Sequence, residues 1–187
     1  MTRKITVRFD LDPMAEARLS GVGGQSRRLA EAIANHPQID LEGFYFNFRN
    51  SRHQPQTTIT NYRTLNFPLK FYAKLASYGL NFPFDWRMPP VDVTFFPNFV
   101  TWKTSRSTLS VTTIHDLTFL YFPELVEAKN LAHLKRVVPR SLKQADLIIT
   151  VSEAIKAEIV KEYATDPDKI LVVPIAVSEL FRNFDPK

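Results

Sequence analysis

The sequence predicts an α/β fold built on a doubly wound parallel sheet. Short β-branched and apolar runs alternate with longer amphipathic segments from residue 4 to residue 173. The run at residues 109–114 is continuously apolar or Thr/Val-like, which is typical of a strand covered on both faces. Such alternation indicates βαβ units joined by right-handed crossovers.

The N-terminal elements follow from periodicity. Residues 4–9 are expected to form the first strand and residues 41–48 the second. Between them, residues 22–34 should form a helix with Leu29, Ile33 and several alanines on one face. Residues 67–78 are predicted to form an aromatic-faced helix, because rings recur there at helical spacing.

The C-terminal half continues the alternation. Short strands are expected at 91–96, ended by Pro97, and at 109–114. A helix is predicted over 130–144, and Pro139 should kink or split it. The strand at 146–151 is the clearest of all.

The last elements are a helix and a strand. Ser152 is expected to cap a helix that runs to about Tyr163, and residues 170–173 should form the final strand. Residues 174–187 lack periodicity and resemble a linker.

Composition bounds the class of protein. At 187 residues and 44% hydrophobic content the chain fits one large domain, and the absence of cysteine excludes disulfides and thiolate metal sites. The four histidines form no HxxxH or HxH pair, so no metal is expected. No stretch approaches the roughly 18 apolar residues of a membrane span, and residues 1–9 lack an apolar signal region. These features favour a cytoplasmic protein.

Positive charge is concentrated between Arg49 and Arg106. This segment has eight Lys and Arg residues against two acids, and aromatic rings and prolines lie among them. It could contact an anionic membrane surface or a partner, or simply pack on its own aromatic core. No nucleic-acid-binding signature is present, and the basic residues do not share one helix face, so no nucleic acid is expected.

The most informative motif is TTIHDLTFLYFPE at residues 112–124. His115 and Asp116 follow a buried strand, and ligands of open parallel sheets bind outside the carboxyl ends of strands. The pair is therefore a candidate site. Alternatively, His115 hydrogen-bonds a loop carbonyl and Asp116 caps a turn.

A glycine cluster, SGVGGQ at residues 20–25, precedes the first helix. Its backbone N–H groups and the helix dipole would favour a phosphate. A dinucleotide fingerprint is a poor fit, because Ser26 occupies the third glycine place and about a dozen residues separate the cluster from the strand. An NAD(P)-linked enzyme remains an alternative, as does a plain glycine-rich helix start.

Taken in order, GVGG, TIHDLTFLYFPE, ADLIITVSEAIKAEIVKEY and DKILVVP resemble the N-terminal domain of a family-4 retaining glycosyltransferase of GT-B architecture. The resemblance implies a Rossmann-like acceptor domain, which would span residues 1–175. Residues 176–187 would then lead to a C-terminal donor domain. It also implies a nucleotide-sugar donor, a glycan or lipid-linked acceptor, and no cofactor or metal.

The resemblance also assigns roles to residues. His115 matches the histidine that reaches the transferred sugar, and Gly21, Gly23 and Gly24 match the loop beside the donor phosphates. Asp116 matches the acid of the HD pair, and Ser152 a cleft-facing serine.

The sequence departs from the family where the donor would bind. It has no two glutamates separated by seven residues, and Pro174 to Val177 stand where an Asn-Gly turn is usual. The chain alone is therefore expected to be inactive, working with a donor half that lies outside it. A non-catalytic module that binds an acceptor or a partner is the other alternative.

Overall fold

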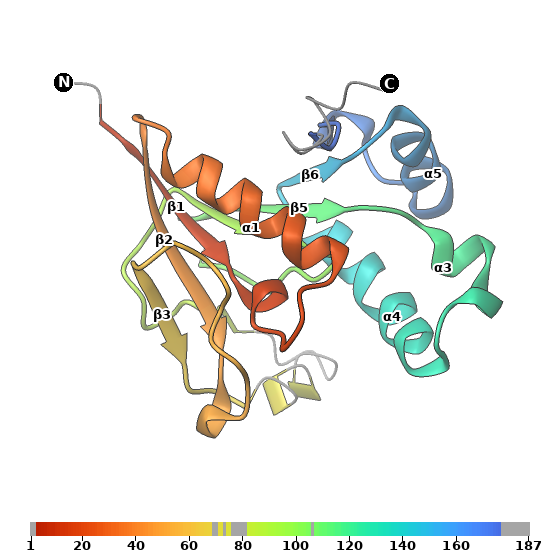
Figure 1. Ribbon diagram of the computed structural model, residues 1–187. Helices are drawn as coiled ribbons and strands as arrows, with labels where there is room; N and C mark the ends of the chain where they lie inside the picture. Colours follow the sequence, from red (N-terminus) through yellow and green to blue (C-terminus); the bar gives the residue numbers. More distant parts are fainter. Residues whose placement is uncertain (1–2, 69–70, 73, 76–81, 106, 177–187) are drawn as a thin grey trace, which may run out of the picture.

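The computed structural model describes residues 3–176, apart from 69–70, 73, 76–81 and 106, as an α/β fold around one parallel sheet (Figure 1). The strands are Ile5–Asp10 (β1), Ile39–Phe46 (β2), Tyr62–Leu65 (β3), Val93–Phe96 (β4), Leu109–Ile114 (β5), Leu147–Thr150 (β6) and Ile170–Val172 (β7). The helices are Gly21–Ala34 (α1), Thr118–Tyr121 (α3), Ala128–Gln144 (α4) and Glu153–Tyr163 (α5). Short 3-10 turns lie at Asp12–Met14, Phe48–Asn50, Pro123–Leu125 and Pro167–Lys169.

The predicted fold class is confirmed. The described strands form a seven-stranded sheet in the order β3-β2-β1-β4-β5-β6-β7, and every pairing is parallel. The order reverses at β1, which pairs with β2 on one side and β4 on the other. A Rossmann-like sheet opens a crevice at such a switch point, outside the carboxyl ends of the strands.

Alternating side chains divide the core between the two faces of the sheet. On β4, Phe95 packs with the cluster around α1, whereas Phe96 packs with the aromatic cluster that includes Tyr72 and Trp102. On β6, Ile148 packs with Val138 of α4 and its neighbours. The sheet therefore has α1 on one face and α4 with the aromatic cluster on the other.

Most predicted elements are present, but helix α3 was not expected, and there are further differences at β3 and α4. The edge strand β3 was not expected, because its sequence YRTL has only one strongly apolar residue. Helix α4 begins at Ala128 and continues through Pro139, so the predicted split is wrong. The buried side chains of Val138 and Leu142 hold the helix against the core where proline removes one backbone donor.

Two predictions concern segments that lie wholly or partly outside the residues that the structure describes. The helix predicted over 67–78 falls largely on undescribed positions, although Phe71, Tyr72, Lys74 and Leu75 are helical. The predicted linker at 176–187 lies outside the described residues except for Ala176.

A buried arginine ties the central strand to the segment that follows β3. The Arg8 side chain on β1 is fully buried, and its Nε donates to Glu42 Oε1 at 2.6 Å. Its Nη2 donates to the Pro89 carbonyl at 2.6 Å, and its Nη1 lies 3.6 Å from Asp85 Oδ2. Asp85 in turn accepts hydrogen bonds from the Ser105 N–H and hydroxyl. This network fixes the loops on both sides of β4 to the centre of the sheet.

Replacing Arg8 should therefore be costly. Arg8→Met should lower the free energy of unfolding by about 3–5 kcal/mol, because it leaves the buried Asp85 carboxylate without its cation and leaves Glu42 with only the 3.5 Å pair to Arg63. Arg3→Met is the matched control, since Arg3 pairs with Asp92 at the surface and should cost about 1 kcal/mol or less. Urea unfolding of both variants tests this, and equal losses would contradict the network's role.

Candidate functional site

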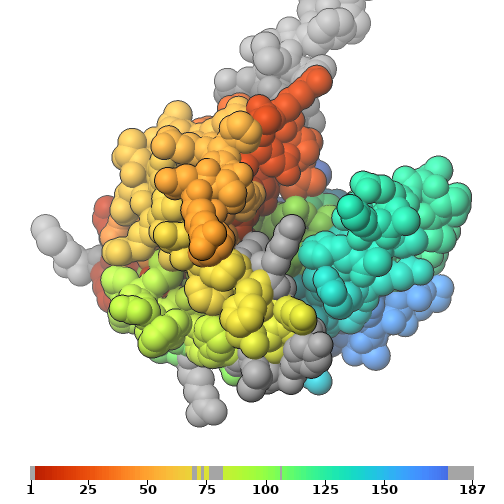
Figure 2. Space-filling model, turned by 90° about the horizontal axis from the view of Figure 1, so that it is seen from below, coloured from red at the N-terminus to blue at the C-terminus, as the bar shows by residue number. Residues whose placement is uncertain are grey.

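A large hollow lies at the carboxyl edge of the sheet, beside the β1/β4 switch point. It is a cavity of about 1150 Å³, and Figure 2 shows the hollow between the teal residues of α4 and the orange residues that follow β2. Its lining combines residues that follow β1 and β2 with residues that follow β4 and with one side of α4. The position is the one that a Rossmann-like sheet gives to a ligand.

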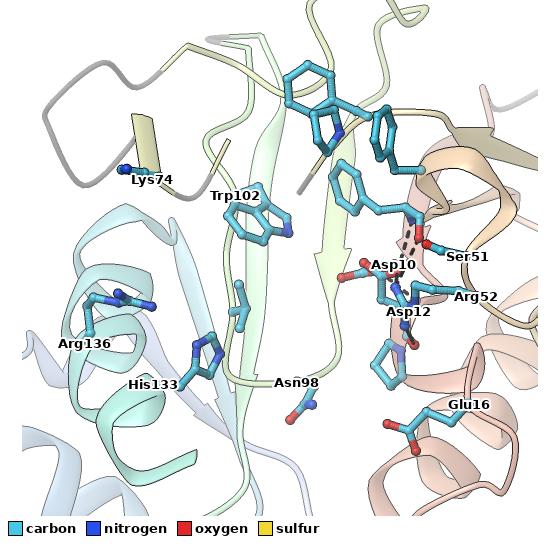
Figure 3. A pocket seen from close by; sticks show the side chains of 16 residues that line it. Asp10, Asp12, Glu16, Ser51, Arg52, Lys74, Asn98, Trp102, His133 and Arg136 are labelled. Atoms are coloured by element: carbon cyan, nitrogen blue, oxygen red, sulfur yellow. Dashed lines mark hydrogen bonds and ion pairs between the residues drawn. The ribbon is translucent and has the colours of Figure 1, made fainter. Parts of the chain in front are cut away.

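Two carboxyl groups and an arginine form one wall of this cavity (Figure 3). Asp10, the last residue of β1, accepts the Asp12 N–H at 2.9 Å. Asp12 accepts the Phe46 N–H at 3.1 Å and is ion-paired with Arg52. Arg52 also donates to the Asp12 carbonyl at 2.9 Å. Asp12 is thus held by structural contacts, whereas Asp10 has no cation bonded to it among the described residues.

Burial raises the pKa of the Asp10 carboxyl well above its ordinary value, and the neighbouring Asp12 carboxylate raises it further. Burial also raises the pKa of Asp12, although Arg52 opposes that shift. A buried carboxyl that faces a cavity and resists ionisation is typical of functional sites.

The opposite wall is basic. Figure 3 shows Lys74, His133 and Arg136 across the cavity from Asp10 and Asp12, with Trp102 between the walls. Partial burial and the nearby Arg136 guanidinium lower the pKa of His133. Of His133 and Arg136, Arg136 is therefore the residue that stays positively charged at neutral pH.

A second cavity, of about 670 Å³, lies on the α1 face of the same edge and contains His115. Its lining includes Gln25, Ser26 and Arg28 of α1 and the segment from Val173 to Ala176. Because β5 alternates, Ile114 points to the α4 face and His115 to the α1 face. His115 and Asp10 therefore line different cavities on either side of the sheet edge.

The His115 ring is oriented by the backbone. Its Nε2 lies 2.9 Å from the Pro97 carbonyl, and its ring packs edge-on against Phe99. A carbonyl only accepts, so Nε2 carries the proton, and in the neutral ring Nδ1 is an acceptor. The predicted carbonyl contact exists, and Nδ1 has no hydrogen-bond partner among the described residues.

The three glycines lie at the start of α1 and line neither cavity. The Ser20 hydroxyl accepts the Gly23 N–H at 3.1 Å, and the Ser20 carbonyl accepts the Gly24 N–H at 2.9 Å. Only Gly23 is required for packing, because a Cβ there would lie 2.5 Å from the Pro13 carbonyl oxygen. The N–H group of Gly21 precedes the first intrahelical bond and stays available to an anion.

Asp116 and Ser152 make the local contacts that their residue types favour. Asp116 accepts the Thr118 N–H at 2.9 Å and so shapes the turn into α3. The Ser152 hydroxyl accepts the Ile155 N–H at 3.3 Å and caps α5. Neither residue lines either of the two cavities.

The described residues offer neither a metal site nor a membrane-spanning helix. They contain no group of three or more His, Asp or Glu side chains that could hold a metal ion. Within the same residues no helix is both long enough and apolar enough to cross a bilayer.

Sequence reasoning missed the wall formed by Asp10, Asp12 and Arg52. The signal was present, since FDLD places carboxylates where the first strand ends. The contribution of Arg52 could not be seen, because 40 residues separate it from Asp12. His133 and Arg136 were also missed, because no motif marks them within the predicted helix at 130–144.

A parallel α/β sheet with ligand-sized cavities at its carboxyl edge defines a Rossmann-like binding domain. The sequence model of Glycosyltransferase Family 4 matches residues 20–179, and the chain belongs to this family. A comparison with curated proteins gives no match. The fold is that of a GT-B half, and the family supports a glycosyltransferase-type function.

The pKa of Asp10 predicts how stability depends on pH. Asp10→Asn should raise the free energy of unfolding at pH 7, because the wild-type carboxyl ionises more easily in the unfolded chain than in its buried site. Each unit of pKa shift corresponds to about 1.4 kcal/mol. The gain should shrink as the pH falls through the raised pKa toward about pH 4, where the unfolded carboxyl is protonated too.

Asp92→Asn is a control of opposite sign. Hydrogen bonds from the Thr6 N–H and hydroxyl lower the pKa of Asp92, so this substitution should destabilise at pH 7, with a difference that also fades in acid. Thermal unfolding from about pH 2 to pH 8 measures both, because the Asp92 difference fades only below the pKa of an unfolded aspartate, about 4. A less stable Asp10→Asn variant at pH 7 would refute the buried-carboxyl interpretation.

Proposed function

We propose that this chain is the acceptor-side domain of a retaining glycosyltransferase, which moves a sugar from a nucleotide-sugar donor to a glycan or lipid-linked acceptor. The observation that carries the proposal is a cavity of about 1150 Å³ at the strand-order switch of a family-4 domain. The cavity is large enough for a sugar and the group attached to it.

The acceptor binds in the cavity beside Asp10. The Asp10 carboxyl is buried and faces the cavity, so it can exchange hydrogen bonds with a sugar hydroxyl. Trp102, Phe67 and Phe46 supply flat apolar surface for the sugar ring.

Transfer suits this site better than hydrolysis does. Glycosidases use two carboxyl groups that flank the scissile bond. Here Asp12 is committed to Arg52 and to the Phe46 N–H, which leaves Asp10 as the one carboxyl of the pair with an open side.

The donor lies on the α1 side of the same edge. The start of α1 at Gly21, Gly23 and Gly24 borders the donor diphosphate, whose developing negative charge the helix dipole and the free N–H group of Gly21 stabilise. His115 meets the transferred sugar through Nδ1, because Nε2 is occupied by the Pro97 carbonyl. Asp116 holds the turn that follows His115, and Ser152 fixes the start of α5 close to the same edge.

A second Rossmann-like domain supplies the remaining donor contacts from across the edge. The proposal is supported by the sequence, which contains no two glutamates separated by seven residues to hold a donor. Catalysis needs groups that bind the transition state from both sides, so this chain alone is expected to show no turnover. No cofactor or metal takes part, and the nucleotide sugar is a substrate.

The segment between β3 and β5 is proposed to touch an anionic membrane, where a lipid-linked acceptor would reside. Phe71, Phe82 and Trp86 are exposed there, and the Arg87 guanidinium stacks 5.3 Å from the Trp86 ring. Aromatic rings beside cations are typical of interfacial contacts.

Vesicle co-sedimentation tests this contact. At low salt the chain should sediment with phosphatidylcholine vesicles that contain phosphatidylglycerol more than with phosphatidylcholine alone, and added salt should weaken the difference. Trp86→Ser should lower the bound fraction. Equal sedimentation with both kinds of vesicle would exclude the membrane contact.

The role of His115 is tested in the two-domain enzyme. His115→Ala should lower kcat by about a hundredfold or more with little change in Tm, since it removes one preorganised polar group from the reacting sugar. His36→Ala is the control, because His36 lies between α1 and β2 at the amino ends of the strands. Undiminished transfer by His115→Ala would refute the assignment, and turnover by the isolated chain would refute the two-sided site.

A further inference from the structure

Helix α4 carries an ordered stripe of basic side chains. The stripe consists of Lys129, His133, Arg136 and Arg140, and the helix contains no acidic residue. Spacings of four, three and four residues place these side chains on one face. The opposite face buries Val138 and Leu142 in the core, so the stripe is held in a fixed direction.

The stripe faces the large cavity. His133 and Arg136 line the cavity directly. Burial raises the pKa of Tyr72 to about 12, and the Arg140 guanidinium partly opposes that shift. Within the described residues, neither His133 nor Arg136 has a hydrogen-bond or ion-pair partner. Arg52, on the other wall, forms an ion pair with Asp12. Within the described residues, Arg136 thus presents to the cavity a positive charge that no ion pair neutralises.

The two walls differ in what they can bind. Asp10 and Glu16 on one side can form hydrogen bonds with hydroxyl groups, and neither offers positive charge to an anion. The α4 wall attracts an oxyanion, and a guanidinium can bind phosphate or carboxylate through two parallel hydrogen bonds. Trp102 lies between the walls and offers a ring face to an apolar surface. A ligand complementary to this cavity has hydroxyl groups at one end and an anionic group at the other.

We propose that the acceptor is an anionic sugar, whose phosphate or carboxylate binds Arg136 and His133 of α4 while its hydroxyl groups face Asp10. This inference depends on the proposed function only in naming the ligand an acceptor. The shared chemistry is an oxyanion covalently joined to a sugar. A sugar 1-phosphate represents a lipid-linked acceptor, and a uronic acid represents an acidic glycan.

A binding experiment without any donor tests the proposal. Glucose 1-phosphate, glucuronic acid, glucose and inorganic phosphate are each titrated into the 187-residue chain by isothermal calorimetry. At least one charged sugar should bind about tenfold or more tightly than both glucose and inorganic phosphate, as expected for a charge-assisted contact combined with sugar contacts. The charged sugar that binds more tightly identifies the source of the anion.

Matched variants on α4 locate the contact. Arg136→Gln should reduce the preference for the charged sugar to about that for glucose, whereas Lys135→Gln should retain it. Both residues are exposed on the same helix, but only Arg136 lines the cavity. Circular dichroism confirms that both variants fold.

Four outcomes would overturn the proposal. These are equal binding of charged and neutral sugars, equal losses in the two variants, inorganic phosphate binding as tightly as the charged sugars, and no binding of either charged sugar. None of them bears on sugar transfer itself, which the activity of the two-domain enzyme tests separately.

Discussion

The parallel order of the sheet is the constraint on which the rest of the structure depends. Parallel strands need crossover connections, so all carboxyl ends gather at one edge, and the reversal at β1 opens that edge. A central strand is covered on both faces, so a charged residue on it destabilises the fold unless it is paired with an opposite charge. Arg8 is paired with Glu42 and Asp85, whereas Asp10, at the open end of the same strand, has no cation bonded to it among the described residues, and burial raises the pKa of its carboxyl. The paired Arg8 inside the sheet therefore favours the folded state, whereas the buried Asp10 at the edge lowers the free energy of unfolding, as is common at functional sites.

Side-chain alternation then gives the edge two different surfaces. The cavity on the α4 face combines carboxyl groups, cations and aromatic rings, while the cavity on the α1 face is mainly apolar around His115. The HD motif and the Asp10 wall therefore belong to opposite sides of the sheet. This separation fits a transferase, because donor and acceptor must approach one reacting centre from different directions.

The sequence predicted the fold well because the fold depends on local periodicity. The strand at 109–114, the cap at Ser152 and the apolar face of α4 were all readable from spacing. Strand β3 was missed because its four residues, YRTL, do not alternate clearly between apolar and polar. The helix was not split at Pro139, because tertiary packing outweighs the loss of one backbone hydrogen bond. Only part of the candidate site could be predicted from the sequence. His115 stands in a motif, whereas Arg52 and Arg136 reach the cavity through contacts distant in sequence.

The central claim is that the α4-side cavity, rather than the α1 side, receives the acceptor. Amide chemical-shift mapping of the isotopically labelled chain with a charged sugar tests it most directly. The account predicts that the largest shifts fall in residues 10–16 and along α4 from Lys129 to Arg140. Largest shifts in residues 20–28 and 113–115, around the His115 cavity, would contradict it.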